Sequence, residues 1–173
     1  MVDRVADALA PVTSELLLVS DHPGAPGWLP GARVVHDALS GGGSAAGVHA
    51  ALVAAGGPVI VVAWDLPFVD TCTVAELLRN GDESVVDAVV PAGASGDSFE
   101  PLCGWYAPRC ADVIAQAWET GDRSLHGVLR RVRTRVVPAA RFAPCGGAGR
   151  LFLNVNTADD LEQARRIGGA TAG

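Results

Sequence analysis

PVIVVAWDLPFVD, residues 58–70, is an almost wholly apolar run that meets one carboxylate, Asp65, followed at once by a proline turn. Its β-branched residues show no polar alternation, which is typical of a central parallel strand covered on both faces. Asp65 then lies at the carboxyl end of that strand, where open α/β sheets bind their ligands. The other interpretation of Asp65 is a turn cap formed through an Asx hydrogen bond, and the spacing alone leaves both interpretations open.

Strands and helices alternate along the chain on both sides of this stretch. This order predicts an α/β fold with a doubly wound, mostly parallel sheet and helices on both faces. We expect a single domain that spans residues 1–173, because no linker, repeat or low-complexity block divides the chain. Strands are predicted at 15–20, 33–36, 59–64, 85–92, 101–108 and 135–139, helices at 2–10, 44–55, 72–80, 109–119 and 124–132, and a last strand and helix within 150–167.

One predicted strand, 101–108, contains Gly104. A glycine inside a strand indicates a bulge or a close approach of another backbone. We expect this strand to pair with a lip of chain that begins near Phe99.

Composition and charge exclude several classes of protein. Hydrophobic residues make up 49% of the chain and the mean hydropathy is +0.28, yet no apolar run is long enough to span a membrane. The first residues, MVDRVADALAP, are amphipathic and acidic, unlike a signal peptide, so we expect a cytoplasmic protein. A net charge of −6 argues against partners such as nucleic acid or an anionic membrane.

The basic residues are all arginines, 13 in number, and the sequence contains no lysine. That absence is notable because lysine is a common partner of nucleotide phosphates. The cysteines do not form C-x-x-C pairs, and no histidine stands at zinc-ligand spacing from them. We therefore expect reduced structural thiols at Cys72, Cys103, Cys110 and Cys145.

A glycine-rich turn joins a short strand to a predicted helix. Asp37 follows the strand, and three consecutive glycines occupy positions 41–43. Residues 44–55 then have the composition of a helix. Backbone N–H groups at a helix N-terminus can hold an anion or a ribose-phosphate. The turn is not a P-loop, because the G-K-[ST] ending is missing, and a turn that binds nothing remains the alternative.

Four blocks of the sequence resemble the molybdenum cofactor guanylyltransferase family. In chain order they are VVHDALSGGGSAAGVHAAL, VIVVAWDLPFV, EPLCGWY and FLNVNTADDLEQA. The most specific pieces are WDLPF, similar to the family's D-x-P-[FY] turn, and NVNTADDL, similar to its N-V-N-T-x-x-[DE]-L ending. The resemblance covers nearly the whole chain. It implies a Rossmann-like nucleotidyltransferase that joins GMP from GTP to molybdenum-bound molybdopterin and releases pyrophosphate.

The resemblance also implies roles for single residues. Asp65 would be the catalytic carboxylate that holds Mg²⁺ against the GTP phosphates, and Asp37 would contact the nucleotide. In GSAAG, Gly43 and Gly47 would match the nucleotide-binding G-P-L-[AG]-G turn of the family, from which Ser44 departs. Asn154 and Asn156 would face the pterin, although the stretch from Asn154 to Thr157 can equally be a strand-end turn and helix cap.

One part of the family pattern has no match in this sequence. Relatives begin with a first strand and a phosphate loop, L-A-G-G-x-S-x-R-M-G-x-D-K, whereas residues 1–9 resemble the helix that follows that loop. We therefore expect a sheet without the family's first strand at its centre, where neighbouring strands close the gap or another chain fills it. We also expect negligible nucleotidyl transfer by the purified chain, because the loop's donors stabilise charge on the triphosphate.

These features leave several functional hypotheses open. The first hypothesis is that the chain is a fragment of a working guanylyltransferase. The second is that it is a non-catalytic relative that binds a nucleotide or a partner protein. The third is that it is a cytidylyltransferase of the same fold. Arg123 with Ser124 would meet a phosphate or form a solvated helix cap. The last two predictions concern sets of residues. An anionic partner such as a molybdoenzyme apoprotein, or solvent alone, would contact the basic cluster formed by Arg130, Arg131, Arg133 and Arg135. Packing, rather than stacking on a nucleotide base, is expected for Trp28, Trp64, Trp105 and Trp118.

Overall fold

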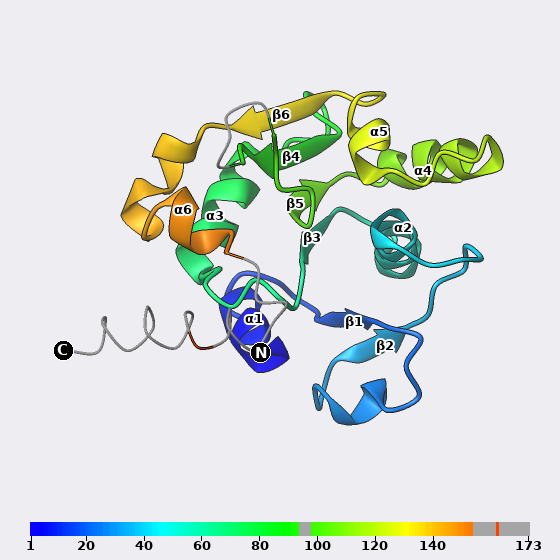
Figure 1. Ribbon diagram of the computed structural model, residues 1–173, viewed down its shortest axis with the longest axis horizontal. Coiled ribbons are helices and arrows are strands. Elements are labelled where there is room, and N and C mark those ends of the chain that lie inside the picture. The colour runs from blue at the N-terminus through cyan, green and yellow to red at the C-terminus, as the bar shows by residue number, and fades with distance from the viewer. Residues whose placement is uncertain (94–97, 154–161, 163–173) are drawn as a thin grey trace.

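The computed structural model describes residues 1–93, 98–153 and 162 (Figure 1). Its strands form two sheets, which confirms the α/β class. The smaller sheet pairs β1 and β2 in parallel, and the larger sheet has the order β3-β5-β4-β6. The strands are β1 (Leu17–Val19), β2 (Arg33–Val35), β3 (Val59–Val62), β4 (Ala88–Pro91), β5 (Cys103–Tyr106) and β6 (Thr134–Val137).

The larger sheet is mixed. Strand β5 runs antiparallel to both of its neighbours, β3 and β4, whereas β4 and β6 are parallel. Strands β3, β4 and β6 therefore run in the same direction, and the carboxyl ends of all three lie on the same side of the sheet, where the strands terminate. The helices are α1 (Val2–Leu9), η1 (Ala25–Gly27), α2 (Ser44–Ala55), α3 (Thr71–Asn80), α4 (Arg109–Glu119), α5 (Leu125–Leu129), η2 (Ala139–Cys145) and α6 (Ala148–Leu151).

Helices cover both faces of the larger sheet (Figure 1). Successive residues of a strand point to opposite faces, so β4 and β5 serve two separate cores. Val89 and Trp105 pack on the face of α3 and η2, whereas Ala88, Val90 and Tyr106 pack on the face of α2, α4 and α5. These residues are at most 5% exposed, so the two middle strands are the best-buried part of the molecule.

Strand β3 differs from its prediction. Its four residues are half-exposed, and it forms the edge of the larger sheet rather than a covered centre. The physical reason is that β5 occupies one side of β3, while no strand in the described part of the chain pairs with the other side. A continuous apolar run does not distinguish an edge strand from a central one when its neighbour is missing.

The prediction for Gly104 is confirmed. A Cβ atom at this position would lie 3.0 Å from the carbonyl oxygen of Val89 and 3.0 Å from Cγ1 of Val90. The predicted lip pairs differently, because Phe99 forms an antiparallel bridge with Ala92, just after β4, and not with the strand 101–108. Glycine at 104 therefore allows β4 and β5 to approach closely in the middle of the sheet.

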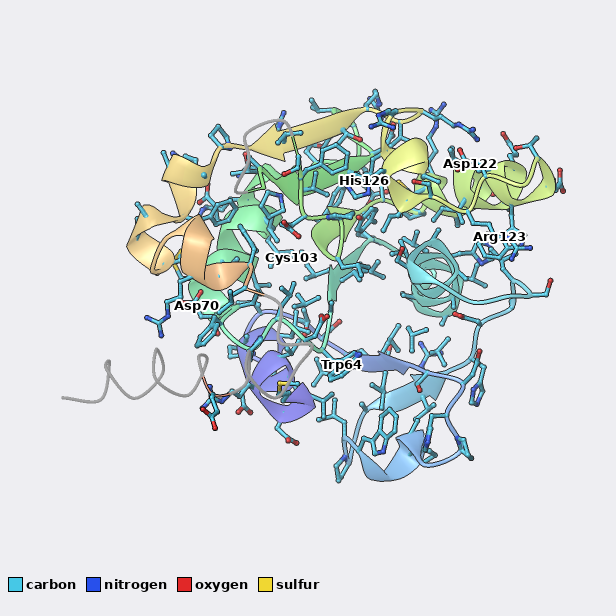
Figure 2. All side chains as sticks on the ribbon, viewed as in Figure 1. Trp64, Asp70, Cys103, Asp122, Arg123 and His126 are labelled. Atoms are coloured by element: carbon cyan, nitrogen blue, oxygen red, sulfur yellow. A yellow bond between two sulfur atoms is a disulfide. The ribbon has the colours of Figure 1, made fainter. Side chains whose placement is uncertain are left out.

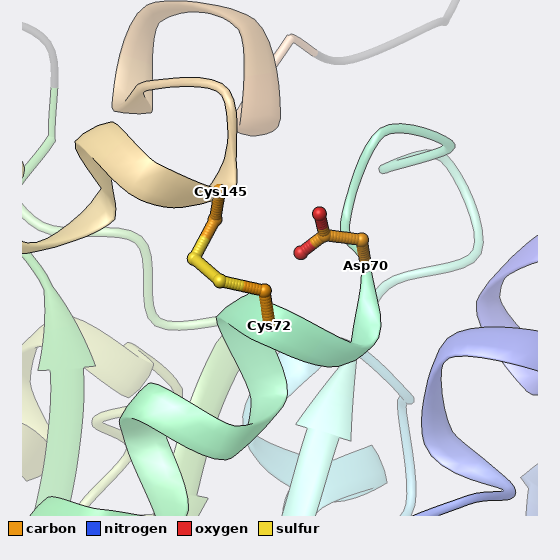
Figure 3. A group of neighbouring side chains, drawn as sticks. All are labelled: Asp70, Cys72 and Cys145. Carbon is orange, nitrogen blue, oxygen red and sulfur yellow. A yellow bond between two sulfur atoms is a disulfide. The ribbon is translucent and has the colours of Figure 1, made fainter.

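Two of the four cysteines form a disulfide, so the prediction of reduced thiols is wrong for this pair. Cys72 lies in the first turn of α3 and Cys145 at the end of η2, with their Cα atoms 5.5 Å apart (Figure 3). The packing of α3 against η2 brings together cysteines that are 73 residues apart in sequence. Cys103 and Cys110 are buried free thiols as expected, and burial raises the pKa of each to about 12.

No helix in the described residues combines the length and the apolar character that crossing a bilayer requires.

Candidate functional site

A cavity of about 800 Å³ separates the two sheets. Strand β1 borders it on one side and β3 on the other, and helices α1 and α2 contribute further walls. In the described chain, neither strand is paired on the edge that faces the cavity. The neighbouring strands therefore do not close the gap that the sequence predicted. The residues from these two strands that line the cavity are Leu17, Leu18, Val19, Val59, Ile60, Val61 and Val62.

Asp65 lies on the cavity wall, in the turn that follows β3. The turn is held by two backbone hydrogen bonds, from Ala63 N to Leu102 O at 2.7 Å and from Leu66 N to Ala63 O at 3.2 Å. The side chain of Leu66 is buried beneath it. Asp65 itself is half-buried, and its carboxylate makes no hydrogen bond or ion pair with the described residues.

Asp65 therefore does not form the Asx hydrogen bond of a turn cap, and the helix that follows is capped by another carboxylate. Asp70 is the N-cap of α3, and its Oδ1 accepts hydrogen bonds from the backbone N–H of Thr73 at 2.9 Å and from the Thr73 hydroxyl at 2.8 Å. An N-cap satisfies amide groups that have no partner inside the helix. Asp65 is thus left free to bind a ligand.

The glycine turn before α2 also borders this cavity. Gly41, Gly42 and Gly43 have φ values of +101°, +63° and +107°, a region that residues with a side chain rarely adopt. Gly43 is the N-cap of α2 and accepts the hydrogen bond from Gly47 N at 3.0 Å. Since no side chain caps α2, its first amide groups are open to an anion at the cavity wall.

Asp37 joins the turn to β2 and carries an unusual carboxylate. Its backbone N–H donates to Oδ1 of Asp21 at 3.1 Å, while its own Oδ1 is buried without a hydrogen-bond partner in the described residues. Burial and the neighbouring Asp21 carboxylate raise the pKa of Asp37, and the His49 imidazole opposes this shift. A buried acceptor without a donor indicates a position that a ligand hydroxyl or a cation would complete.

The structure thus brings four of the predicted site residues to one cavity. Asp37, Gly43, Gly47 and Asp65 all line it, although Asp37 and Asp65 follow different strands in different sheets. The predicted pterin-side residues Asn154 and Asn156 lie outside the described residues, as does Thr157.

The carboxylates at this cavity fit a hard divalent cation. Mg²⁺ is typically bound by one or two carboxylates together with substrate oxygens and water. Both carboxylate oxygens of Asp65 lack a hydrogen-bond partner among the described residues, and so does Oδ1 of Asp37. A second cluster in the described chain, Asp70 with Cys72 and Cys145, fits a metal poorly because its two sulfurs are joined in the disulfide (Figure 3).

Two tryptophans that were expected to pack are exposed. Trp28 is 45% exposed and Trp64 61%, whereas Trp105 is 5% exposed and packs in the core as predicted. Trp64 also lines the cavity next to Asp65 and lies near the carboxyl end of β3 (Figure 2). Its position one residue before Asp65 was the signal that could have marked it as a site residue.

Three of the remaining minor candidates, Ser124, Arg131 and Arg133, have structural partners. Ser124 is a helix cap, since its hydroxyl accepts from Gly127 N at 3.2 Å. Arg131 pairs with Asp122 at 2.7 Å, and Arg133 pairs with Asp87 at 2.8 Å. The basic cluster is therefore largely committed within the chain.

Comparisons with known proteins show the family to which the chain belongs. Residues 1–136 match the family model described as the MobA-like NTP transferase domain. The chain is 31% identical to a molybdenum cofactor guanylyltransferase of Desulfosudis oleivorans over 95% of its own length and 80% of that protein. A probable molybdenum cofactor guanylyltransferase of Pelotomaculum thermopropionicum is 32% identical over 95% of this chain and 78% of that protein.

A solved structure has a similar fold. Molybdopterin-guanine dinucleotide biosynthesis protein A from Archaeoglobus fulgidus superposes with a TM-score of 0.82 at 29% identity, over 98% of this chain and 85% of that chain.

Proposed function

We propose that this chain, which belongs to the family of MobA-like NTP transferase domains, is a molybdenum cofactor guanylyltransferase. The reaction transfers GMP from GTP to molybdopterin that carries molybdenum, and it releases pyrophosphate. One observation carries the proposal: Asp65 and the Asp37–glycine turn border the same cavity. That arrangement supports nucleotide binding because it combines a carboxylate for a metal with open amides for an anion.

Each of these residues has a distinct role in the proposed reaction. Asp65 would hold Mg²⁺, which neutralises the triphosphate and aligns the attacking and leaving oxygens when it is bound. The amides at the start of α2, between Gly43 and Gly47, would hold the nucleotide. Asp37 would accept a hydrogen bond from a nucleotide hydroxyl at its orphaned Oδ1. Asn154 and Asn156 would face the pterin.

The transfer requires no deep general base from the protein. The attacking group is the terminal phosphate of the pterin, which is already an anion at neutral pH. One of its oxygens forms a bond to the α-phosphorus of GTP, and the bond from that phosphorus to the pyrophosphate oxygen breaks. We propose that residues 1–173 act as one domain in the cytoplasm and deliver the product to a molybdoenzyme apoprotein.

Asp65→Asn tests the proposal. Titration of GTP in the presence and absence of Mg²⁺, followed by calorimetry and by intrinsic tryptophan fluorescence, should show Mg²⁺-dependent binding to the wild type. The variant should lose that dependence and keep its melting temperature, because Asn cannot supply an anionic ligand to the metal. Asp112→Asn removes an exposed carboxylate from α4 and should bind as the wild type does.

Other outcomes separate the alternatives. Mg²⁺-dependent binding that survives in Asp65→Asn would remove Asp65 from the site. Binding of CTP in preference to GTP would favour a cytidylyltransferase. Negligible pyrophosphate release by the purified chain is already expected from its missing phosphate loop. GTP binding without pyrophosphate release in the presence of molybdenum-bound molybdopterin would therefore favour a non-catalytic relative only if it persists when that loop is supplied.

A further inference from the structure

The side chain of Arg123 lies against the glycine turn. A Cβ atom added at Gly41 would come within 2.5 Å of Nη1 of Arg123 and 3.3 Å of its Cζ. The guanidinium group therefore contacts the backbone of the turn, in space that only a glycine leaves open. Arg123 comes from the connection between α4 and α5, about 80 residues after the turn, so the fold and not the sequence brings them together (Figure 2).

The surroundings hold Arg123 in place. Its guanidinium stacks over the ring of Trp118, with Cζ 4.8 Å from the ring centroid. In the same turn, Ser124 N donates to Oδ1 of Asp122 at 3.0 Å, and Oδ2 of Asp122 accepts from Arg131 at 2.7 Å. A guanidinium that is already stacked on a ring, in an ordered turn, loses less conformational entropy on binding an anion than a freely moving arginine side chain does.

Arg123 has no anionic partner among the described residues, although many arginines of this chain do. It makes no hydrogen bond or ion pair there, and it is exposed. Several arginines pair with carboxylates in the part of the chain that the structure describes, and they include Arg33, Arg79, Arg131, Arg133 and Arg141. An ordered cation that lacks a counter-ion beside a turn with open amides is a suitable contact for an anion.

We propose that Arg123 binds a phosphoryl group seated at the glycine turn, together with the first amides of α2. Gly43 lines the cavity and is two residues from Gly41, hence within about 7.6 Å of it, a span that a guanidinium fork and a phosphate bridge. The inference rests on the proposed function for the identity of the substrate. The phosphoryl group belongs to the nucleotide or to the phosphomonoester of molybdopterin. In a chain without lysine, this arginine supplies the cationic contact.

Calorimetric binding measurements with Arg123→Ala test the proposal. The probes are GTP, guanosine, inorganic pyrophosphate and molybdopterin. Loss of one charge-assisted contact should weaken binding of a phosphorylated probe about 10- to 100-fold and leave guanosine unaffected. Arg123→Lys should recover part of the affinity because it keeps the charge without the planar fork. Arg130→Ala, which removes an exposed arginine at the end of α5, should bind within about twofold of the wild type.

The outcomes identify the source of the phosphoryl group. Weaker binding of GTP assigns it to the nucleotide, and weaker binding of molybdopterin alone assigns it to the pterin; either result supports the role of Arg123. Equal affinities of the variant and the wild type for all phosphorylated probes would overturn it. An equal loss for guanosine would also overturn it, because that loss reports a damaged turn and not a missing phosphate contact.

Failure of the proposed function would look different. A wild-type chain that binds neither GTP nor molybdopterin contradicts the guanylyltransferase proposal. If that chain still binds pyrophosphate, and Arg123→Ala weakens this binding, the phosphate contact stands without the proposed substrates. A wild-type chain that binds none of the phosphorylated probes overturns both proposals.

Discussion

Asp87 is a buried carboxylate whose two oxygens are both engaged by one arginine. Its Oδ1 accepts from Nη2 of Arg133 at 2.8 Å, and its Oδ2 accepts from the backbone N–H of Arg133 at 2.9 Å. The Arg133 side chain donates further to the carbonyl oxygens of Glu83 and Ser84. These bonds join the chain at the start of β4 to the chain at the start of β6, so a single residue fixes the parallel pair at one edge of the sheet.

Asp87→Asn should destabilise the protein by about 2–4 kcal/mol at neutral pH, because it leaves the donors of Arg133 without a charged acceptor. The Arg133 hydrogen bond lowers the pKa of Asp87 in the folded state. A carboxyl group with a lowered pKa contributes stability above its unfolded pKa of about 4, and that contribution disappears as the pH falls through the folded value. Urea unfolding at pH 7 and at pH 2.5 measures both effects.

The stability difference between Asp87→Asn and the wild type should therefore shrink in acid. An exposed control, Asp112→Asn, should unfold like the wild type at pH 7. A loss for Asp87→Asn of the same size at both pH values would show that the ion pair is not the cause, and that packing of the altered side chain is.

The sequence allowed some site residues to be predicted and not others. Asp37 and Asp65 follow apolar runs, and the carboxyl end of a strand is a position that local sequence reveals. Arg123 was a weak candidate because its contacts with Gly41 and Trp118 depend on tertiary packing that no local spacing encodes. Trp64 was assigned to packing for a similar reason: its exposure depends on which strand stands beside β3.

At the scale of elements, β5 is the strand whose fit is tightest. The backbone of Gly104 faces the carbonyl oxygen of Val89 at a distance that leaves no space for a methyl group, and Tyr106 Cε2 would lie 3.1 Å from an added Cβ. Both neighbours of β5 are backbone-paired to it, so the strand cannot shift without disturbing β3 or β4. Interiors packed in this way respond to added volume with strain.

Gly104→Ala should consequently lower the free energy of unfolding by about 1–3 kcal/mol, as overpacked cores do. Gly57→Ala is the matched control, because a Cβ atom there meets nothing within 4 Å. That substitution should be neutral or slightly stabilising, since it mainly restricts the unfolded chain. Denaturant unfolding of the two variants side by side makes the comparison, and equal stabilities would contradict the close approach of β4 and β5.

Element types were easier to predict than the direction of strands. The helical spacing of α2, α3 and α4 and the apolar runs of β3 and β4 were visible in the sequence because both patterns are local. The antiparallel orientation of β5 was not, since an apolar run such as Cys103–Tyr106 is the same in either direction. The bridge between Phe99 and Ala92, where the chain turns back after β4, was not predicted either.

At the scale of the whole molecule, α3 contacts both a helix that lines the cavity and the segment that carries one half of the disulfide. Helix α1 packs on α3 and lines the cavity, whereas η2 packs on α3 and carries Cys145. The pairing of Cys72 with Cys145 was beyond sequence analysis, because a separation of 73 residues follows no spacing rule and depends on the fold. The α/β class, by contrast, followed from the order of the elements alone.

The disulfide should contribute strongly to global stability. A cross-link that closes a loop of 73 residues removes enough entropy from the unfolded chain to be worth about 4 kcal/mol in the loop-closure treatment. We expect Cys145→Ser to unfold at a lower urea concentration than the wild type, by a free energy approaching this value, and to be insensitive to reductant. The wild type should lose a similar amount when a phosphine reductant is added.

Cys103 and Cys110 provide an internal control for that experiment. Both thiols are buried and already reduced, so a reductant has no bond to break at either position. Cys110→Ser should therefore remain as sensitive to the reductant as the wild type, whatever its own stability. If the wild type unfolds at the same urea concentration with and without reductant while mass spectrometry shows that the bond has been cleaved, the cross-link constrains the unfolded chain far less than its loop length implies. In that case the packing of η2 on α3, and not the covalent bond, holds the C-terminal part of the described chain in place.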